Sequence, residues 1–190
     1  KKSNGVINLG SHFSIFSDES ASLEINDILK IENQKKFKLS DSEIPLFNVT
    51  ASTIWMKISL TTNEDEQWFF YWGCPNAQVV ELYKIADGEI TSIKAGILRP
   101  YEERSMIGNN VMFPLRLKKG EVADFYLKIN DIAPLRGLVK AGTQTDLADW
   151  TFTKVFWQGS FLGIMILMVL YNLFLYLTNR KRVYLYYIIY

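Results

Sequence analysis

Aromatic rings close to cationic side chains are the groups in this sequence best suited to binding chemistry. Residues 67–72 read Gln-Trp-Phe-Phe-Tyr-Trp, and an extended strand places Trp68, Phe70 and Trp72 on one face because successive side chains alternate. Sugars present apolar C–H faces that stack on such rings, and their hydroxyl groups bond to cations, amides and carboxylates. We therefore predict a binding site that joins one aromatic face of this strand to Trp55, Lys57, Tyr101, Glu103 and Arg104.

The same aromatic face has a second interpretation. One face of each strand in a β-sandwich packs in the core, and Trp68, Phe70 and Trp72 are side chains of the kind found there. In either case the second face of the strand must be covered or must bind something, because large exposed apolar patches are rare without a role. The sequence leaves open whether these three rings point inward or outward.

Patterns typical of catalysis are missing from the sequence. It has one histidine, His12, and one cysteine, Cys74, and it contains no serine-hydrolase, zinc-protease or nucleotide-binding signature. A single cysteine excludes an intrachain disulfide. The run Asn63–Glu66 offers oxygen ligands suited to calcium, and a charged hairpin tip is the simpler interpretation. We expect no enzymatic activity, no cofactor and no metal site.

Short strands separated by turns dominate the first 140 residues. Residues 54–60 alternate cleanly between apolar and polar faces, and residues 23–31 show the spacing of a short helix. Asp87-Gly88 predicts a tight hairpin between residues 78–85 and 89–94, and residues 118–121 predict another between 111–117 and 123–129. Further strands are expected at 6–16, 67–72 and 136–140. The pattern predicts a mainly β fold, an antiparallel jelly roll or β-sandwich.

An uncharged apolar run, Phe156–Leu177, follows this part of the chain. As a helix it would be about 33 Å long at 1.5 Å per residue, enough for a hydrocarbon core of about 30 Å. Arg180, Lys181 and Arg182 come directly after it, and short basic loops stay in the cytoplasm. We expect a transmembrane helix that leaves residues 1–155 outside the cytoplasm.

These patterns divide the chain into four segments. We predict an extracytoplasmic β domain at 1–140, a juxtamembrane linker at 141–155, a first transmembrane helix at 156–178 and the start of a second at 183–190. Because the chain lacks both an initiator methionine and a signal peptide, we expect further sequence at both ends. All 20 Asp and Glu residues precede the span, so the extracytoplasmic domain is slightly acidic, which argues against nucleic acid as a partner.

Polar and small residues inside the span suggest helix packing. Gly159 and Gly163 form a G-x-x-x-G pattern, which lets a second helix approach closely, either within one bundle or in a homodimer. Asn172 lies at membrane depth, where an amide needs a hydrogen-bond partner.

Four sequence motifs carry a resemblance to a known family. They are IWMKISLTTN at 54–63, VELYK at 80–84, AGILRPYEER at 95–104, and FWQGSFLGIMILMVLYNLFLYLTNRKRVYLYY at 156–187. Together they resemble the bacterial seven-transmembrane receptors with diverse intracellular signalling modules, in the subclass with a carbohydrate-binding-like jelly roll outside. Lys57 stands where that family usually has arginine, and lysine cannot reproduce a bidentate arginine contact.

The resemblance implies a receptor in the bacterial cytoplasmic membrane. A carbohydrate or related ligand would bind outside, the seven-helix domain would relay the change, and a cytoplasmic kinase, cyclase or phosphatase module would follow. The alternative is a protein-interaction or dimerisation module without a small ligand, whose aromatic face would be buried against a partner.

Overall fold

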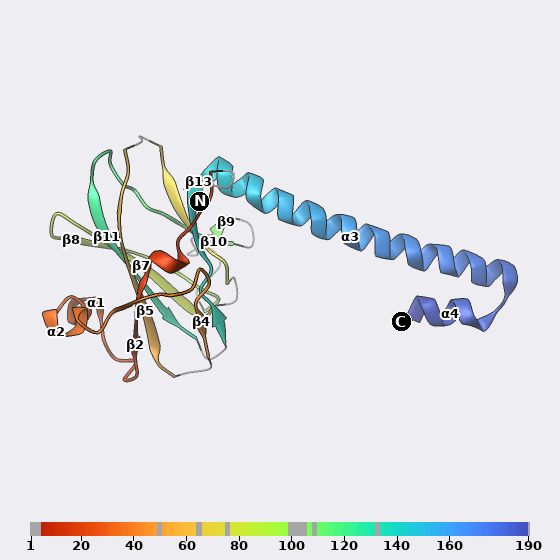
Figure 1. Ribbon diagram of the computed structural model, residues 1–190, viewed down its shortest axis with the longest axis horizontal. Coiled ribbons are helices and arrows are strands. Elements are labelled where there is room, and N and C mark those ends of the chain that lie inside the picture. Colours follow the sequence, from red (N-terminus) through yellow and green to blue (C-terminus); the bar gives the residue numbers. More distant parts are fainter. Residues whose placement is uncertain are drawn as a thin grey trace. The chain divides into compact units, whose positions relative to one another are not determined.

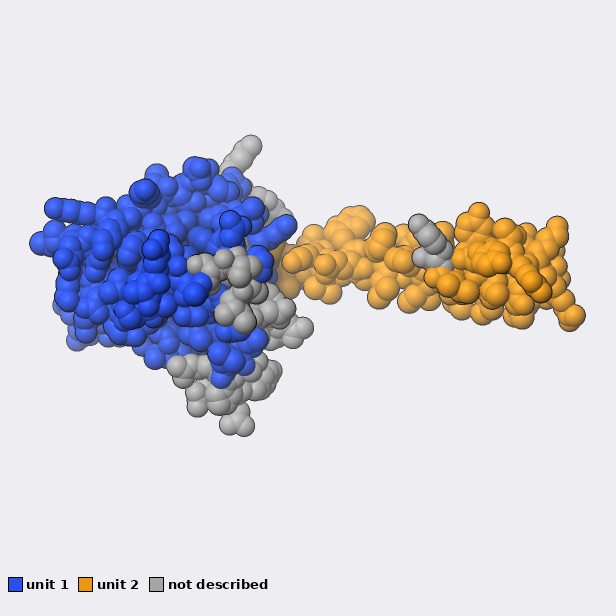
Figure 2. Space-filling view, turned by 90° about the horizontal axis from the view of Figure 1, so that it is seen from below, with its two compact units in different colours: residues 1–147 blue, residues 148–190 orange. Residues whose placement is uncertain are grey.

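The computed structural model describes residues 5–48, 51–63, 66–74, 77–98, 106–107, 110–131 and 134–189. The chain divides into two compact units, Lys1–Leu147 and Ala148–Tyr190 (Figure 2). The first unit holds the strands, and the second holds nearly all of one long helix and a short helix after it (Figure 1).

The described elements, in chain order, alternate short strands with turns as the sequence predicts. They are β1 (Ile7–Asn8), a 3-10 turn η1 (Gly10–His12), β2 (Ser14–Asp18), α1 (Ile25–Ile28), α2 (Ile31–Gln34), β3 (Lys38–Leu39), β4 (Leu46–Phe47), β5 (Thr53–Thr61), β6 (Trp68–Trp72), β7 (Val79–Ala86), β8 (Glu89–Ala95), β9 (Met106–Ile107), β10 (Asn110–Pro114), β11 (Val122–Asn130), β12 (Leu135–Arg136), β13 (Val139–Thr143), α3 (Gln144–Asn179) and α4 (Arg182–Ile189).

Two antiparallel sheets face each other and form the predicted β-sandwich. One has the strand order β1-β13-β6-β10-β9, the other β3-β2-β5-β11-β7-β8, and β4 pairs with β12 in a small ribbon. The fold class expected from the sequence, mainly β with a long apolar helix after it, is therefore confirmed.

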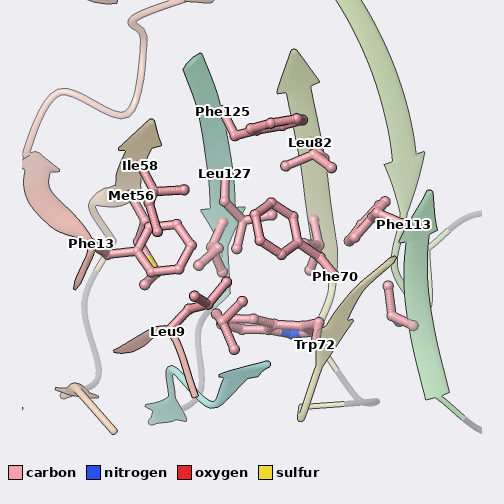
Figure 3. Close-up of a cluster of buried hydrophobic side chains, with 14 of the residues drawn as sticks. Leu9, Phe13, Met56, Ile58, Phe70, Trp72, Leu82, Phe113, Phe125 and Leu127 are labelled. Atoms are coloured by element: carbon pink, nitrogen blue, oxygen red, sulfur yellow. The ribbon is translucent and has the colours of Figure 1, made fainter. Parts of the chain in front are cut away.

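The core lies between the two sheets and follows the period of two along each strand. On β5 the inward residues are Ile54, Met56 and Ile58, and these positions face Ile129, Leu127 and Phe125 across the β5–β11 ladder. From the other sheet Phe70 and Trp72 point into the same space, as Figure 3 shows. Their exposed fractions are only 2% and 1%, so these two rings belong to the core.

A second apolar cluster covers the outer face of the six-stranded sheet. Trp55, Tyr83 and Tyr126 point away from the core and pack beneath Ile25 and Ile28 of the short helix α1. The buried carboxylate Asp18 fixes the approach to this helix, because it accepts hydrogen bonds from the backbone N–H groups of Ser20 and Leu23. The helix-like spacing predicted for residues 23–31 is thus confirmed, as α1 and the start of α2.

The two predicted hairpins have different outcomes. Strands β7 and β8 pair around Asp87 and Gly88, both of which have positive φ, so the first hairpin is confirmed. The second prediction is wrong, because β10 pairs with β6 and β9 whereas β11 pairs with β5 and β7 of the opposite sheet. The turn at residues 118–121 does form, with Gly120 at a φ of +77°, but the segment before it crosses between the sheets and separates the two strands.

Helix α3 starts one residue after the end of strand β13. Residues 141–155, expected as a linker, therefore lie in the end of β13 and the first turns of α3. Among the described residues α3 is the one helix long and apolar enough to cross a membrane, by length and composition. It ends at Asn179, Arg180 adopts a φ of +50°, and α4 begins at Arg182.

Candidate functional site

The residues of the site predicted from the sequence fall on different faces of the sandwich. Trp55 and Lys57 lie on the outer face of the six-stranded sheet, whereas Phe70 and Trp72 lie between the sheets. Tyr101, Glu103 and Arg104 lie outside the described residues. The structure therefore does not bring Trp55 and Lys57 together with the aromatic strand.

Trp55 and Lys57 are both engaged by neighbouring side chains. The Trp55 ring is fully buried, and the Lys128 ammonium lies 5.4 Å from its centre. The Lys57 ammonium donates a hydrogen bond of 2.9 Å to Gln34 Oε1 and lies 5.4 Å from the centre of the Tyr126 ring. These contacts tie the outer face of the sheet to the α1–α2 segment, which is a structural role.

Trp68 differs from the other aromatic residues of β6 because it lines an open cleft. The Trp68 cleft has a volume of about 340 Å³ and is lined by Ile7, Leu9, Leu60, Thr61, Thr62, Asn63, Trp68, Leu115, Leu117 and Ala141. These residues come from β1 and the residue after it, from the end of β5 and the residues that follow, from the start of β6, from the middle of β13 and from the segment after β10. The cleft borders the core, because Leu9, Leu115 and Ala141 belong to both.

Short neutral polar groups accompany the apolar walls of the Trp68 cleft. Thr61, Thr62 and Asn63 stand at the end of β5, and both Thr61 and Asn63 are exposed. The buried Trp68 Nε1–H finds no acceptor among the residues that the structure describes. An unpaired buried donor costs about 1–3 kcal/mol, so a ligand that offers the Trp68 N–H an acceptor atom would be bound more tightly. None of the described lining residues carries a charge.

A second cleft, of about 420 Å³, lies between the β7–β8 hairpin and the segment after β10. Two of its charged groups form an ion pair: Lys84 Nζ lies 2.6 Å from Glu121 Oε1, and Lys84 also donates to the backbone oxygen of Arg116 at 2.7 Å. The backbone N–H of Lys118 and the Lys84 ammonium hold the pKa of the Glu121 carboxyl below its ordinary value. We call this the Lys84 cleft; its ion pair fixes the crossing segment.

The buried carboxylate Glu81 is also satisfied within the fold. Burial works against its ionised form, but hydrogen bonds from the Tyr83 hydroxyl and the Lys94 ammonium prevail and lower its pKa. Burial and the Glu81 carboxylate together raise the pKa of Tyr83. In the part of the chain that the structure describes, no group of three or more His, Cys, Asp or Glu side chains is placed to hold a metal ion.

Gly159, Gly163 and Asn172 of the long helix show no contact with another element among the described residues. Nothing lies within 4 Å of a Cβ built on Gly159 or Gly163, and the Asn172 amide donates to the backbone oxygen of Met168, one turn earlier. Packing through the two glycines and Asn172 stays a prediction.

Two family models match the chain, one on each side of residue 150. Residues 10–139 match 7TMR-DISM extracellular 2, and residues 154–190 match 7TM diverse intracellular signalling. The chain belongs to this receptor family. It therefore holds the extracellular domain of a membrane receptor and a segment that matches the family's seven-helix domain, as the motifs predict.

Comparison with solved structures gives weak likenesses to β-sandwich modules. One structure, described as TmCBM61 in complex with β-1,4-galactotriose, is 10% identical, with a TM-score of 0.35 over 74% of this chain and 91% of that one. Another, from work on carbohydrate-binding modules of promiscuous specificity, is 11% identical, with a TM-score of 0.29 over 75% of this chain and 56% of that one. Likenesses at this level carry no argument about the ligand. A comparison with curated proteins finds no significant match.

Sequence reasoning identified Trp68 but missed the rest of its cleft. Leu60, Leu115 and Leu117 lie at the end of a strand or just beyond one, at the border between the core and the cleft. That placement is the signal that was available. The pairing of strands across the two sheets, which brings the three together, has no local signature.

Proposed function

We propose that this chain is the ligand-sensing part of a bacterial membrane receptor and that the Trp68 cleft binds a neutral carbohydrate or a closely related compound. The observation that carries the proposal is the composition of the cleft: an indole ring and aliphatic walls beside the hydroxyl and amide groups of Thr61, Thr62 and Asn63. Apolar walls with a few placed polar groups are typical of small-molecule sites.

The uncharged described walls of the Trp68 cleft favour a neutral ligand. The described walls of the Trp68 cleft hold no cation to pair with a carboxylate, sulfate or phosphate, whereas desolvating such a group without a partner is costly. A neutral sugar loses only hydroxyl hydration, and the threonine, asparagine and indole groups replace part of it. Uronic acids and sugar phosphates are therefore disfavoured against neutral sugars.

The volume of the Trp68 cleft favours a short ligand. A volume of about 340 Å³ lies at the lower end of the range of roughly 300–1,000 Å³ typical of small-molecule sites. It suits one or two sugar rings, with the rest of any longer chain outside.

The family and the basic cluster after the span support the following cellular arrangement. Residues 1–155 lie outside the cytoplasm, Arg180–Arg182 lie inside, and the membrane is the bacterial cytoplasmic membrane. Ligand shifts the population of the sensor domain, the seven-helix domain passes the shift on, and a cytoplasmic kinase, cyclase or phosphatase module responds.

Isothermal titration of the full chain in lipid nanodiscs tests the site. Neutral di- and trisaccharides are compared with the corresponding uronic acids, and Trp68→Ala is compared with Thr91→Ala, which alters the Lys84 cleft instead. We expect at least one neutral sugar to bind, and Trp68→Ala to weaken that binding about tenfold or more, which corresponds to about 1.4 kcal/mol. Binding that depends on Thr91 and not on Trp68 would refute the placement.

One observation favours a second function, a protein-interaction module. Leu39 of β3 and Leu46 of β4 are each 70% exposed and line an open groove of about 670 Å³ at the edge of the six-stranded sheet. Exposed apolar side chains at a sheet edge are typical of contact surfaces. Light scattering of the chain and of Leu39→Lys decides the matter: a dimer that the substitution dissociates would support this function, and a monomer in both would oppose it.

A further inference from the structure

One threonine joins the last strand of the sandwich to the first turn of helix α3. The Thr143 hydroxyl donates a hydrogen bond of 2.8 Å to Asp146 Oδ2, and the Asp146 backbone N–H donates one of 3.2 Å back to Thr143 Oγ1. Thr143 is thus both the final residue of β13 and the cap of α3. Such a cap satisfies an N–H group that has no partner within the helix.

The first turn of α3 packs tightly against the sandwich, within the unit that ends at Leu147. Leu147 is fully buried, and a Cβ built on Gly142 would lie 3.3 Å from its Cγ. A Cβ on Gly5 would lie 2.1 Å from Asp146 Oδ1, so the chain entering β1 passes directly against the capping carboxylate. The helix therefore begins inside the packed domain, and its first turn cannot move independently of β13.

Strand pairing places the cap next to the Trp68 cleft. Trp68 and Thr143 are direct partners in the β6–β13 ladder, and the Cβ atoms of such partners lie about 4.5–5.5 Å apart on the same face. Ala141, two residues earlier on β13, lines the cleft itself. One wall of the cleft and the cap of α3 are thus built on the same strand.

We propose that Thr143 is the residue through which occupation of the Trp68 cleft is passed to helix α3. A ligand that fills the cleft holds the Trp68 ring against β13, which restricts the rotation of the Thr143 side chain and strengthens its bond to Asp146. An empty cleft leaves the ring and the threonine free to turn, and the cap opens more often. Helix α3 continues without interruption from Gln144 to Asn179, so its first turn and its apolar part are one element.

The role of Thr143 rests on the proposed function, because the natural ligand is the carbohydrate proposed above. A covalent probe that fills the cleft tests the role of Thr143 without that ligand. Cys74 is replaced by serine, and Asn63→Cys is labelled with N-phenylmaleimide to fill the Trp68 cleft. The matched control carries the same label at Thr91→Cys, an exposed position in the Lys84 cleft. Hydrogen exchange at the Asp146 amide is measured on the full chain in nanodiscs, with thermal unfolding as the check on folding.

We expect the label at position 63 to slow exchange of the Asp146 amide about fivefold or more, and the label at position 91 to leave it unchanged. Thr143→Val keeps the shape of the side chain but cannot cap, so exchange should be faster and no longer respond to the label. Thr143→Ser restores a hydroxyl and should restore the response.

Unchanged or faster exchange after labelling at position 63 would overturn the inference, as would a response that survives in Thr143→Val. The two proposals also fail separately. Sugar binding without any change at Asp146 refutes the role of Thr143 alone, whereas a response to the label in a chain that binds no sugar refutes the carbohydrate ligand alone.

Discussion

Trp72 and Trp68 lie on the same face of one strand, yet we predict that Trp72 matters mainly for stability and Trp68 mainly for ligand binding. Trp72 is 1% exposed and packs in the centre of the core, whereas Trp68 is half-buried at the edge and lines the cleft. Replacing a fully buried tryptophan by alanine costs about 3–5 kcal/mol, because apolar contacts are lost and a cavity remains. The same replacement at Trp68 removes fewer buried contacts, and we expect it to cost about 1–2 kcal/mol.

Calorimetric unfolding of the full chain in nanodiscs measures this difference. For a chain of this size 1 kcal/mol corresponds to about 2–4 °C, so Trp72→Ala should lower the midpoint by about 6–20 °C and Trp68→Ala by less than about 8 °C. Sugar binding should show the reverse order: Trp68→Ala loses it, whereas Trp72→Phe, which retains a ring in the core, keeps it. Equal destabilisation by the two alanine variants would refute the assignment of Trp72 to the core and Trp68 to the cleft.

Two further predictions concern stability. Folding lowers the pKa of Glu121, so the contribution of its carboxylate to the free energy of unfolding is present above the unfolded pKa of 4.5 and is lost as pH falls through the folded pKa. The unfolding midpoint of the unmodified chain should therefore fall more steeply below about pH 4.5 than the midpoint of Glu121→Gln. Parallel profiles of midpoint against pH would contradict this. Gly96→Ala should prevent folding or lower the unfolding midpoint strongly, because at a φ of +119° the new Cβ would lie 2.3 Å from the Gln78 backbone oxygen. Gly120→Ala is the matched control: Gly120 has a φ of +77° with open space around it, so the substitution should cost only about 1 kcal/mol. Equal losses of midpoint in thermal melts would show that the close contact at Gly96 does not matter.

The elements of the sandwich were predictable because alternation and turn residues act locally. Ile54, Met56 and Ile58 alternate as core residues must, and Asp87-Gly88 favours the positive φ angles that its hairpin needs. Strand partners were not predictable in the same way. The turn at residues 118–121 looked like a hairpin, but the pairing of β10 and β11 depends on distant strands in two different sheets.

The site was only partly predictable for the same physical reason. The period of two correctly grouped Trp68, Phe70 and Trp72 on one face of β6. How deeply each ring is buried depends on how far the opposite sheet covers that face, and the sequence of β6 alone does not determine this. The start of α3 did have a local signal that was missed. Thr143 followed by Asp146 is a capping pattern, and it begins the helix within the segment that had been interpreted as a linker.

The most direct test of the central claim is a ¹⁹F NMR titration of the full chain labelled with 5-fluorotryptophan. The chain has five tryptophans, and a single Trp→Phe substitution at each position assigns its resonance. Neutral di- and trisaccharides are then added to the labelled chain in nanodiscs. Our account predicts a saturable shift of the Trp68 resonance, with the resonances of the buried Trp55 and Trp72 unmoved. A saturable shift at Trp55 without one at Trp68, or no shift with any neutral sugar, would contradict it.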